Sequence, residues 1–546
     1  MTSTNATRAR PGNPGRNEES APGATRRVAA GPLAGWRLLE RLAQRAPGAL
    51  AGRARPFLRS LWSRHRPFTI AVTLGFLLRV LVMVGYFPAM WFPDSFEYVR
   101  VGLYPEPYPI RPSGYSFLLW VLKPFHSLAL VTALQHLMGI AMAVMLYLLL
   151  RRAKLPSWGA TLLTLPVLFD AYQVQLEHLI LSDTLFMFLV MSATTIVLWR
   201  RTFSTRQGVL LGVVLAFATL TRTVGIPVTA LFLVVLLFRR VGWRALTAAG
   251  MACAIPLLAY STWFYAYHGK FGITNGTGIF VYGRVMAFAN CAEMQPMPPK
   301  LAALCTDKPP EERPFSQFYI WDRRSPLHRV PGPQFSPEKS ELALEFAKRA
   351  IVSQPLDYAA VVAGDFTRAF WPGHFVFPDF ATYRHYLFRD EPVPMPDWGT
   401  AAEDARTYAG GPAQTQVLHP VADWLGAYQK VVYLQGPILG ALILFGFVGV
   451  VRRWRRLGDP VFLPWAAASG LILTPAVTAE FDYRYALVTV PLACLASGLV
   501  IAEWRQRRLS IRAEMSARDA ASGHAASTEQ STDDTGEQRQ PAGRPG

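Results

Sequence analysis

Long apolar stretches separated by clusters of arginine dominate this 546-residue sequence. A helix that crosses a bilayer needs about 20 mainly apolar residues. By this measure the candidate spans are 68–88, 128–150, 156–172, 180–199, 207–221, 224–238, 246–266, 431–451, 460–478 and 485–503. Charged residues make up only 17% of the chain, and they lie mostly between these stretches. The pattern predicts an all-α polytopic membrane protein of about ten transmembrane helices, and it excludes a purely soluble enzyme.

The positions of the basic residues indicate the orientation of the spans. If residues 1–66 are cytoplasmic, alternation of the ten spans places four further basic clusters on the same side, namely 151–154, 200–206, 239–244 and 452–456. Lys and Arg concentrate in cytoplasmic loops. We therefore expect a multi-pass protein of the bacterial plasma (inner) membrane with both termini cytoplasmic. The net charge of +19 is explained by these loops and by contact with membrane lipid, so nucleic acid is not an expected partner.

Five regions follow from this topology. Residues 1–66 form a basic N-terminal segment, and 504–546 form a tail; both have compositions typical of disorder. Residues 67–266 hold seven helices and a large first outside loop, 89–127. Residues 267–430 form a small extracytoplasmic domain that contains helix, including an amphipathic one predicted over Ser336–Gln354. Residues 431–503 hold the last three helices.

Two of the four cysteines, Cys291 and Cys305, lie in the predicted outside domain. An oxidising compartment would allow a disulfide, although two cysteines do not fix a pairing, so both the bonded and the free state stay open. No CxxC or HExxH pattern occurs in the chain. The sequence therefore predicts no metal site.

The first outside loop carries the residue types that an acid–base site needs. Asp94, Glu97 and Tyr98 follow the first span closely, and Arg111 and Tyr115 come next. A carboxylate here can act as general base for an acceptor hydroxyl, which makes Asp94 and Glu97 catalytic candidates and the other three binding candidates. The alternative is that Asp94 caps a surface helix, because Asp is a preferred N-cap residue.

Glu177, His178 and Asp183 lie where the fourth span meets the outer face. Ionisable groups at membrane depth are costly and often functional, so these three are substrate-binding candidates. The alternative is that Glu177 sits in interfacial water while Asp183 bonds to a neighbouring helix. Arg79, midway along the first span, needs a partner that the sequence does not identify.

Arg222, Asp482 and Arg484 lie in the outer turns of later spans. The forked donors of arginine suit a phosphate, so Arg222 and Arg484 are candidates for binding one, with Asp482 beside them. The alternatives are that Arg222 extends to the interface from a span end and that Arg484 merely pairs with Asp482.

Several short motifs resemble those of the GT-C glycosyltransferases, specifically the family 39-like bacterial relatives of protein O-mannosyltransferases and aminoarabinose transferases. The matching stretches are Pro93-Asp94-Ser95 with Tyr98, Arg111-Pro-Ser-Gly114-Tyr115, Leu181-Ser182-Asp183, Thr221-Arg222-Thr-Val-Gly225 and Arg484-Tyr485. They are distributed over residues 68–503.

The resemblance implies a reaction on the outer face of the membrane. The donor would be a polyprenyl-phosphate sugar, hexosyl or pentosyl, and the acceptor a cell-envelope glycan, lipid or protein. Asp94 would be the catalytic carboxylate. Many relatives have an acidic pair here, whereas this chain has Asp94-Ser95 with Glu97 three residues after Asp94. One carboxylate with nearby arginines fits a single displacement with inversion. No cofactor is predicted, and a divalent metal is not excluded.

Two other classes of protein fit part of this pattern. A transporter or flippase for a polyprenyl lipid would have many spans too, but transporters usually show repeated halves and charge at mid-membrane. A non-catalytic membrane scaffold would use the outside domain to bind a partner. Since nearly all the candidate charge maps to the outer ends of the spans, the sequence favours the enzyme.

Overall fold

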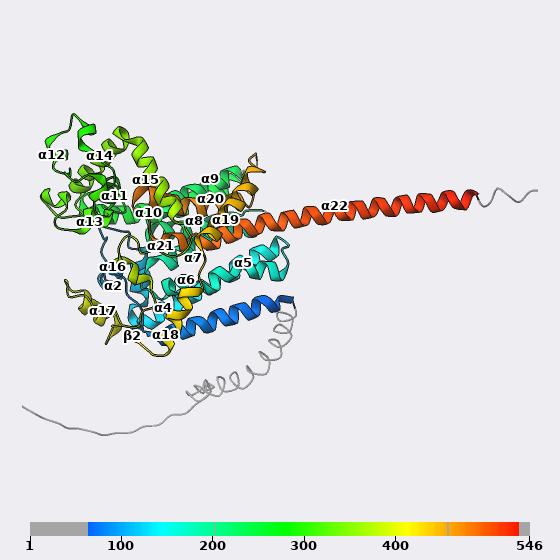
Figure 1. The fold of residues 1–546 in the computed structure, drawn as a ribbon, viewed down its shortest axis with the longest axis horizontal. Coiled ribbons are helices and arrows are strands. Elements are labelled where there is room, and N and C mark those ends of the chain that lie inside the picture. Colours follow the sequence, from blue (N-terminus) through cyan, green and yellow to red (C-terminus); the bar gives the residue numbers. More distant parts are fainter. Residues whose placement is uncertain (1–63, 201, 456–457, 534–546) are drawn as a thin grey trace, which may run out of the picture. The chain divides into compact units, whose positions relative to one another are not determined.

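The computed structural model describes residues 64–200, 202–455 and 458–533, with side chains as far as Asp519 (Figure 1). Apart from Arg64, these residues belong to one compact unit, His65–Gly546. The predicted N-terminal segment, 1–66, lies almost wholly outside the described residues, and so does the end of the predicted tail.

Helices form nearly all of the described chain, as predicted. Five are long and apolar enough to cross a membrane: Arg64–Gly85, α4 (Leu128–Arg152), α7 (Ser182–Trp199), α10 (Trp243–His268) and Tyr483–Asp519, which comprises α21 (Tyr483–Leu487) and most of α22 (Val490–Asp533). A sixth candidate is a pair bent by 52°, α18 (Val421–Val431) and α19 (Gly436–Val451). Four shorter apolar helices are α5 (Ser157–Phe169), α8 (Thr205–Thr221), α9 (Gly225–Phe238) and α20 (Phe462–Thr478). Each predicted span overlaps one of these helices, and the all-α polytopic class is confirmed.

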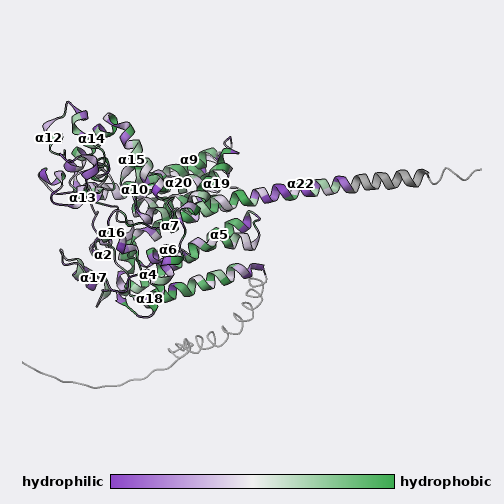
Figure 2. Cartoon of the chain, viewed as in Figure 1, coloured by the Kyte–Doolittle hydropathy of each residue, from purple (hydrophilic) through white to green (hydrophobic). Residues whose placement is uncertain are grey.

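The apolar helices pack into one bundle with a continuous core. Helix α4 contacts α5 and α7, α8 contacts α7 and α10, and α22 contacts α19 and α20. Small residues bring α8 close to α10, because a side chain on Gly208 or Gly212 would overlap backbone carbonyls of α10. Hydrophobic residues cover these helices, whereas hydrophilic residues dominate the region of α12 to α14 (Figure 2).

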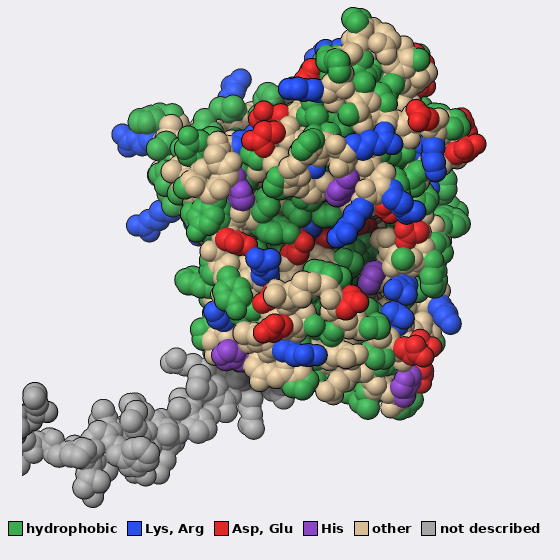
Figure 3. Space-filling view, turned by 90° about the vertical axis from the view of Figure 1, so that its left-hand side faces the viewer, with side chains coloured by type: hydrophobic (Ala, Val, Ile, Leu, Met, Phe, Trp, Pro, Cys, Tyr) green, Lys and Arg blue, Asp and Glu red, His purple; other side chains and the backbone are tan. Residues whose placement is uncertain are grey.

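The predicted outside segments form smaller helices, of which some pack on the bundle core and others surround a second core. The first loop contains α2 (Pro93–Leu103), α3 (Gly114–Leu122) and η1 (Lys123–Phe125). The outside domain contains α11 (Thr277–Val285), η2 (Cys291–Met294), α12 (Pro299–Ala302), η3 (Pro310–Glu312), α13 (Ser316–Trp321), η4 (Pro326–Arg329), α14 (Pro337–Ser353), α15 (Pro355–Arg368), α16 (Phe380–Tyr383), η5 (Arg384–Tyr386) and α17 (Ala401–Ala409). Figure 3 shows the face that carries α12 to α14 and α17, which is hollowed between two parts, with acidic and basic side chains around the hollow.

The outside domain has its own packing and one covalent link. Tyr282 and Phe346 are buried in its core. The amphipathic helix expected over 336–354 is α14, and the Ser336 side chain caps it by accepting a hydrogen bond from the backbone N–H of Lys339. The sulfurs of Cys291 and Cys305 are bonded, with their Cα atoms 6.2 Å apart. Two short strands, β1 (Tyr86–Phe87) and β2 (Gln416–Val417), pair antiparallel and join the start of the first loop to the end of this domain.

The expectation of a disordered tail from residue 504 onward is wrong over residues 504–533. There α22 continues without a break to Asp533. This segment is polar, which favoured disorder, but it is rich in Ala and Arg and lacks proline. Such residues have high intrinsic helix propensity, so a helix already nucleated in the apolar part of α22 extends through them.

Candidate active site

Asp94 lies in the first turn of α2, in the loop that follows the first long apolar helix. Pro93 opens the helix, and the Ser95 hydroxyl accepts a hydrogen bond from the Phe92 backbone N–H over 3.0 Å. Proline suits this position because the first backbone N–H of a helix has no partner within the helix. The N-cap residue is Phe92, so the alternative that Asp94 caps the helix is wrong. Its carboxylate instead faces two arginines.

Arg111 and Arg484 hold the Asp94 carboxylate from two sides. Arg111 binds both oxygens, with Nη1 2.9 Å from Oδ2 and Nη2 3.1 Å from Oδ1. Arg484 donates from Nη1 to Oδ2 over 3.1 Å, across 390 residues of sequence. Burial raises the pKa of Asp94, but the two guanidinium groups lower it further, and the net pKa falls to about 2. Asp94 is therefore ionised, and both of its oxygens are engaged.

Arg484 is itself fixed by its neighbours at the start of α21. Its Nε donates to Asp482 Oδ2 over 3.0 Å, and its guanidinium lies 4.7 Å from the centre of the Phe92 ring. Asp482 also accepts a 2.6 Å hydrogen bond from the Tyr386 hydroxyl. Burial and the nearby Asp482 raise the pKa of Tyr386, so this hydroxyl stays protonated and donates. Asp482 and Phe92 thus aim Arg484 at Asp94.

A third arginine, Arg222, shares an aromatic neighbour, Tyr485, with Arg484. Arg222 follows α8 directly and pairs with Asp183, in the first turn of α7. The Tyr485 ring lies 5.3 Å from the Arg222 guanidinium and 5.4 Å from that of Arg484. One oxygen of Asp183, Oδ2, is buried without a hydrogen-bond partner. Three arginines and three aspartates, from distant segments of the chain, therefore meet in one cluster.

The other candidates from the first loop border this cluster. Glu97 Oε2 lies 3.8 Å from Arg111 Nη2. Burial raises the pKa of Glu97 more than Arg111 lowers it. The Tyr98 hydroxyl bonds to Ser182 next to Asp183, and its ring lies 5.2 Å from the Arg111 guanidinium. Tyr115 is buried behind Tyr98 and donates to Gln135, so it does not face the charged side chains.

Glu177 and His178 do not belong to the cluster, which corrects the expectation that they bind substrate there. Glu177 is fully buried and accepts from Arg79 Nε over 2.7 Å and from Arg79 Nη2 over 2.8 Å. His136 links the two, because one ring nitrogen contacts Glu177 and the other contacts His178, each over 3.1 Å. Glu177 therefore does not sit in interfacial water either. It is the partner that Arg79 needs.

This buried network lies directly behind the segments that carry the cluster. Helix α6 (Ala171–His178) ends at His178, and the next residue pairs with Met90 in a parallel bridge. Met90 donates to the His178 carbonyl over 3.1 Å and accepts from Ile180 over 3.2 Å. The bridge joins the segment leading to Asp94 with the segment leading to Asp183. This bridge explains how two segments that are distant in sequence bring the carboxylates of Asp94 and Asp183 into the same cluster.

Three aromatic residues of the site were not among the sequence candidates. Tyr485 had a signal, since it follows Arg484 and occurs in a motif of the resemblance. Phe92 and Tyr386 had none, because an aromatic residue in a loop is common and Tyr386 comes from a part of the outside domain without a motif. Within the described ranges, no group of three or more His, Cys, Asp or Glu side chains is arranged to hold a metal ion.

Comparisons with known proteins find similarity in structure but not in sequence. No protein-family model matches the chain, and no curated protein matches it. The oligosaccharyltransferase of Archaeoglobus fulgidus in its apo form aligns at a TM-score of 0.39 and 13% identity, over 84% of this chain and 52% of its own. The same enzyme, AglB, in complex with an inhibitory peptide and a dolichol-phosphate, aligns at 0.37 and 12%, over 84% and 52%. ArnT from Cupriavidus metallidurans bound to undecaprenyl phosphate aligns at 0.31 and 14%, over 80% and 77%.

These neighbours are GT-C glycosyltransferases, the class that the sequence motifs resemble. The chain spans about half the length of the archaeal oligosaccharyltransferase. At these TM-scores, the proposed function rests on the residues of the cluster itself.

Proposed function

We propose that this protein is a membrane glycosyltransferase that moves a sugar from a polyprenyl-phosphate donor to an acceptor on the outer face of the plasma membrane. The observation that carries the proposal is the Asp94 carboxylate held between Arg111 and Arg484, with Arg222 alongside. The acceptor is a cell-envelope glycan, lipid or protein. The location in the bacterial inner membrane and the cytoplasmic termini belong to the same proposal.

The arginines suit the leaving group of this reaction. When the sugar departs, negative charge grows on the lipid phosphate, and fixed cations in a site of low dielectric stabilise such charge strongly. Arg484 and Arg222 both contact the Tyr485 ring, so two guanidinium groups lie close together for the phosphate of the donor. No proton has to be supplied to the phosphate, because it is already a good leaving group.

Asp94 is the base for the acceptor hydroxyl, but the resting cluster restrains it. With both oxygens paired and a pKa of about 2, the carboxylate is a weak base. A donor phosphate that takes Arg484 away from Asp94 leaves the carboxylate with Arg111 alone and raises its basicity. The site therefore favours donor binding before proton removal. The acceptor oxygen then attacks the anomeric carbon as the bond to phosphate breaks, with inversion.

The test is the isosteric change Asp94→Asn, which removes the base but keeps the volume. We expect sugar transfer to fall by about 100- to 10,000-fold, the usual contribution of a general base. The assay uses purified full-length protein, lipid-linked sugars extracted from cells that lack the protein, and envelope fractions as acceptor. Asp397→Asn, an exposed aspartate of the outside domain, is the matched control. Unchanged transfer by Asp94→Asn would exclude Asp94 as base.

A second variant tests the phosphate role separately. Arg484→Gln should weaken binding of undecaprenyl phosphate about 10- to 100-fold, because a hydrogen bond to a charged group contributes about 1.5–3 kcal/mol. Native mass spectrometry of the protein with this lipid measures the change. An unaltered affinity would contradict the assignment. The proposed reaction uses no divalent metal. Measuring sugar transfer with and without EDTA tests this part of the proposal.

A further inference from the structure

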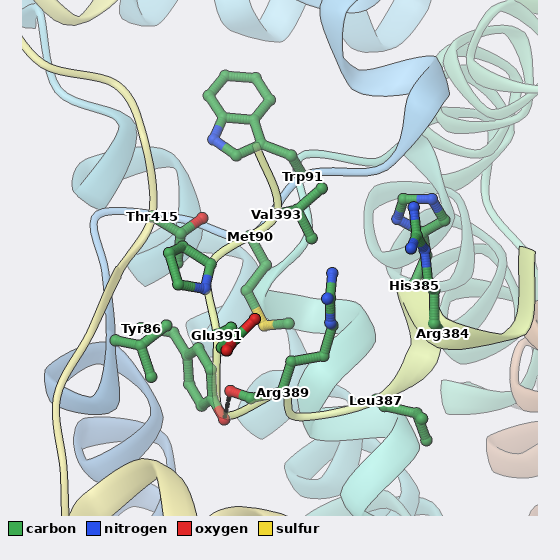
Figure 4. A pocket seen from close by; sticks show the side chains of 12 residues that line it. Tyr86, Met90, Trp91, Arg384, His385, Leu387, Arg389, Glu391, Val393 and Thr415 are labelled. Atoms are coloured by element: carbon green, nitrogen blue, oxygen red, sulfur yellow. Dashed lines mark hydrogen bonds between the residues drawn. The ribbon is translucent and has the colours of Figure 1, made fainter. Parts of the chain in front are cut away.

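A narrow, partly open cleft lies beside the Asp94 cluster (Figure 4). One wall is the stretch that leads into α2, including Tyr86 and Trp91. The other wall is η5 and the chain after it, including Arg384, His385 and Arg389. In Figure 4 the Arg389 side chain extends into the middle of the cleft.

The cleft contains polar nitrogen atoms that lack partners. Arg384 Nε, His385 Nδ1 and Arg389 Nη1 are buried, and none has a hydrogen-bond partner. Among the residues that the structure describes, neither Arg384 nor Arg389 forms an ion pair. Leaving a buried polar group unpaired costs about 1–3 kcal/mol, and more for a charged group. A ligand with acceptor oxygens that enters the cleft can satisfy these donors in place of water.

The charge of the cleft defines the chemistry of that ligand. Burial, with help from the charges of Arg384 and Arg389, lowers the pKa of His385 to about 4, so its ring is neutral at pH 7. Glu391 is the carboxylate that lines the cleft, and Asp379 and Asp390 lie near enough to act on His385 and Tyr86, so the guanidinium groups of Arg384 and Arg389 are the anion-binding donors of the lining rather than part of a uniformly basic surface. Guanidinium groups bind carboxylate and phosphate oxygens through paired donors. The neutral imidazole can bond to a hydroxyl, which a sugar supplies.

The Phe92 side chain connects His385 of the cleft with Arg484 of the Asp94 cluster. The Phe92 ring contacts the His385 ring, with centroids 5.4 Å apart, on the side of the cleft, and it also contacts Arg484. Tyr386, the residue after His385, donates to Asp482 in the cluster. A carbohydrate anchored between Arg384 and Arg389 is therefore adjacent to the site where Asp94 would remove a proton.

We propose that this cleft binds an oxyanion, the carboxylate or phosphate of an anionic carbohydrate, and thereby holds the acceptor next to Asp94. The assignment of the carbohydrate as acceptor rests on the proposed function, whereas the oxyanion site does not. Arg384 and Arg389 bind the oxyanion, and His385 bonds to a neighbouring hydroxyl.

The test is protection of the two arginines from phenylglyoxal, which modifies accessible guanidinium groups. The full-length protein in nanodiscs of zwitterionic lipid is treated with phenylglyoxal in the presence of glucuronate, glucose 1-phosphate or glucose, and modification is mapped by mass spectrometry. We expect either anion to slow modification of Arg384 and Arg389 at least fivefold, while glucose does not. The exposed Arg406 of α17 should react at the same rate throughout.

Variants show whether the two arginines act together. Arg389→Gln should raise the anion concentration that half-protects Arg384 about tenfold, whereas Arg389→Lys, which keeps the charge, should raise it less than about threefold. Asp94→Asn should leave protection unchanged, so loss of transfer and loss of anion binding are separate results. The proposal is overturned if neither anion protects or if glucose protects equally. A second preparation in nanodiscs that contain phosphatidylglycerol is treated in the same way, and protection by that lipid alone also overturns the proposal.

Discussion

The ion pair between Arg79 and Glu177 allows a quantitative test of the buried network. All the donor groups of Arg79 are used: Nε and Nη2 bond to Glu177, and Nη1 and Nη2 also bond to the backbone carbonyls of Gly75, Leu168 and Val167. The two side chains are 2% and 0% exposed, so water cannot replace a lost partner. Removing one member of such a pair typically costs about 3–5 kcal/mol, because the remaining charge is left buried.

The perturbation is Glu177→Gln, which keeps volume and removes the charge. Volume matters here, because Gly139 packs so closely that even a Cβ on it would overlap the Glu177 carboxylate. We expect a loss of about 3–5 kcal/mol for the single variant. For Arg79→Met combined with Glu177→Gln we expect a loss of only about 1–2 kcal/mol, since no charge remains, the new amide oxygen at position 177 can accept from Gln173, and the amide nitrogen can donate to a neutral His136 ring.

The assay is unfolding by SDS in mixed micelles, followed by far-UV circular dichroism and gel filtration. The matched control is Glu345→Gln, which removes an exposed pair with Arg349 whose side chains are 55% and 39% exposed. That change should cost no more than about 0.5 kcal/mol. The reasoning is refuted if Glu177→Gln is as mild as Glu345→Gln, or if the double variant is less stable than the single one.

Three further predictions concern other parts of the structure. Burial raises the pKa of Glu480 to about 7, so the folded state prefers the protonated acid. The stability of the protein should therefore fall by up to about 3 kcal/mol as the pH rises from about 4.5 to 7. Thermal unfolding of Glu480→Gln, measured across this pH range, should not show that loss. Replacing Cys291 and Cys305 with serine opens a link of sequence separation 14 and should destabilise the outside domain by about 3 kcal/mol, measured as faster proteolysis there but not in the bundle. Tyr386→Phe removes the donor to Asp482 and should raise KM for the lipid donor about fivefold with kcat nearly unchanged; a change in kcat alone would contradict a positioning role.

The sequence predicts the helices and much of the cluster for a simple physical reason. A span must be long and apolar, so its ends can be read from composition, and the ends that face outward are then set by the basic loops. This alternation placed Asp94, Asp183, Arg222 and Arg484 on one side, and the structure brings the same four together. Composition could not show the exact contacts, such as Arg222 with Asp183 rather than with solvent.

The errors also have physical causes. Glu177 lies only six residues before Asp183, and nearness in sequence favoured a common site. Helix α6 ends at His178 and the next residue, Leu179, is extended, which turns Glu177 toward Arg79 and away from the outer face. The pairing of Arg79 with Glu177 joins positions 98 apart, which no local pattern reveals. Tyr386 was missed for the same reason, because its contact with Asp482 spans 96 residues.

The 390-residue separation between Asp94 and Arg484 has a consequence for biogenesis. Asp94 emerges early during synthesis, with Arg111 soon after, but Arg484 is made only once most of the chain has been translated. Until the last helix inserts, the nascent protein has no complete site and its Asp94 has only one arginine partner. A stalled or prematurely terminated chain therefore lacks the second arginine partner of Asp94 and cannot assemble the cluster.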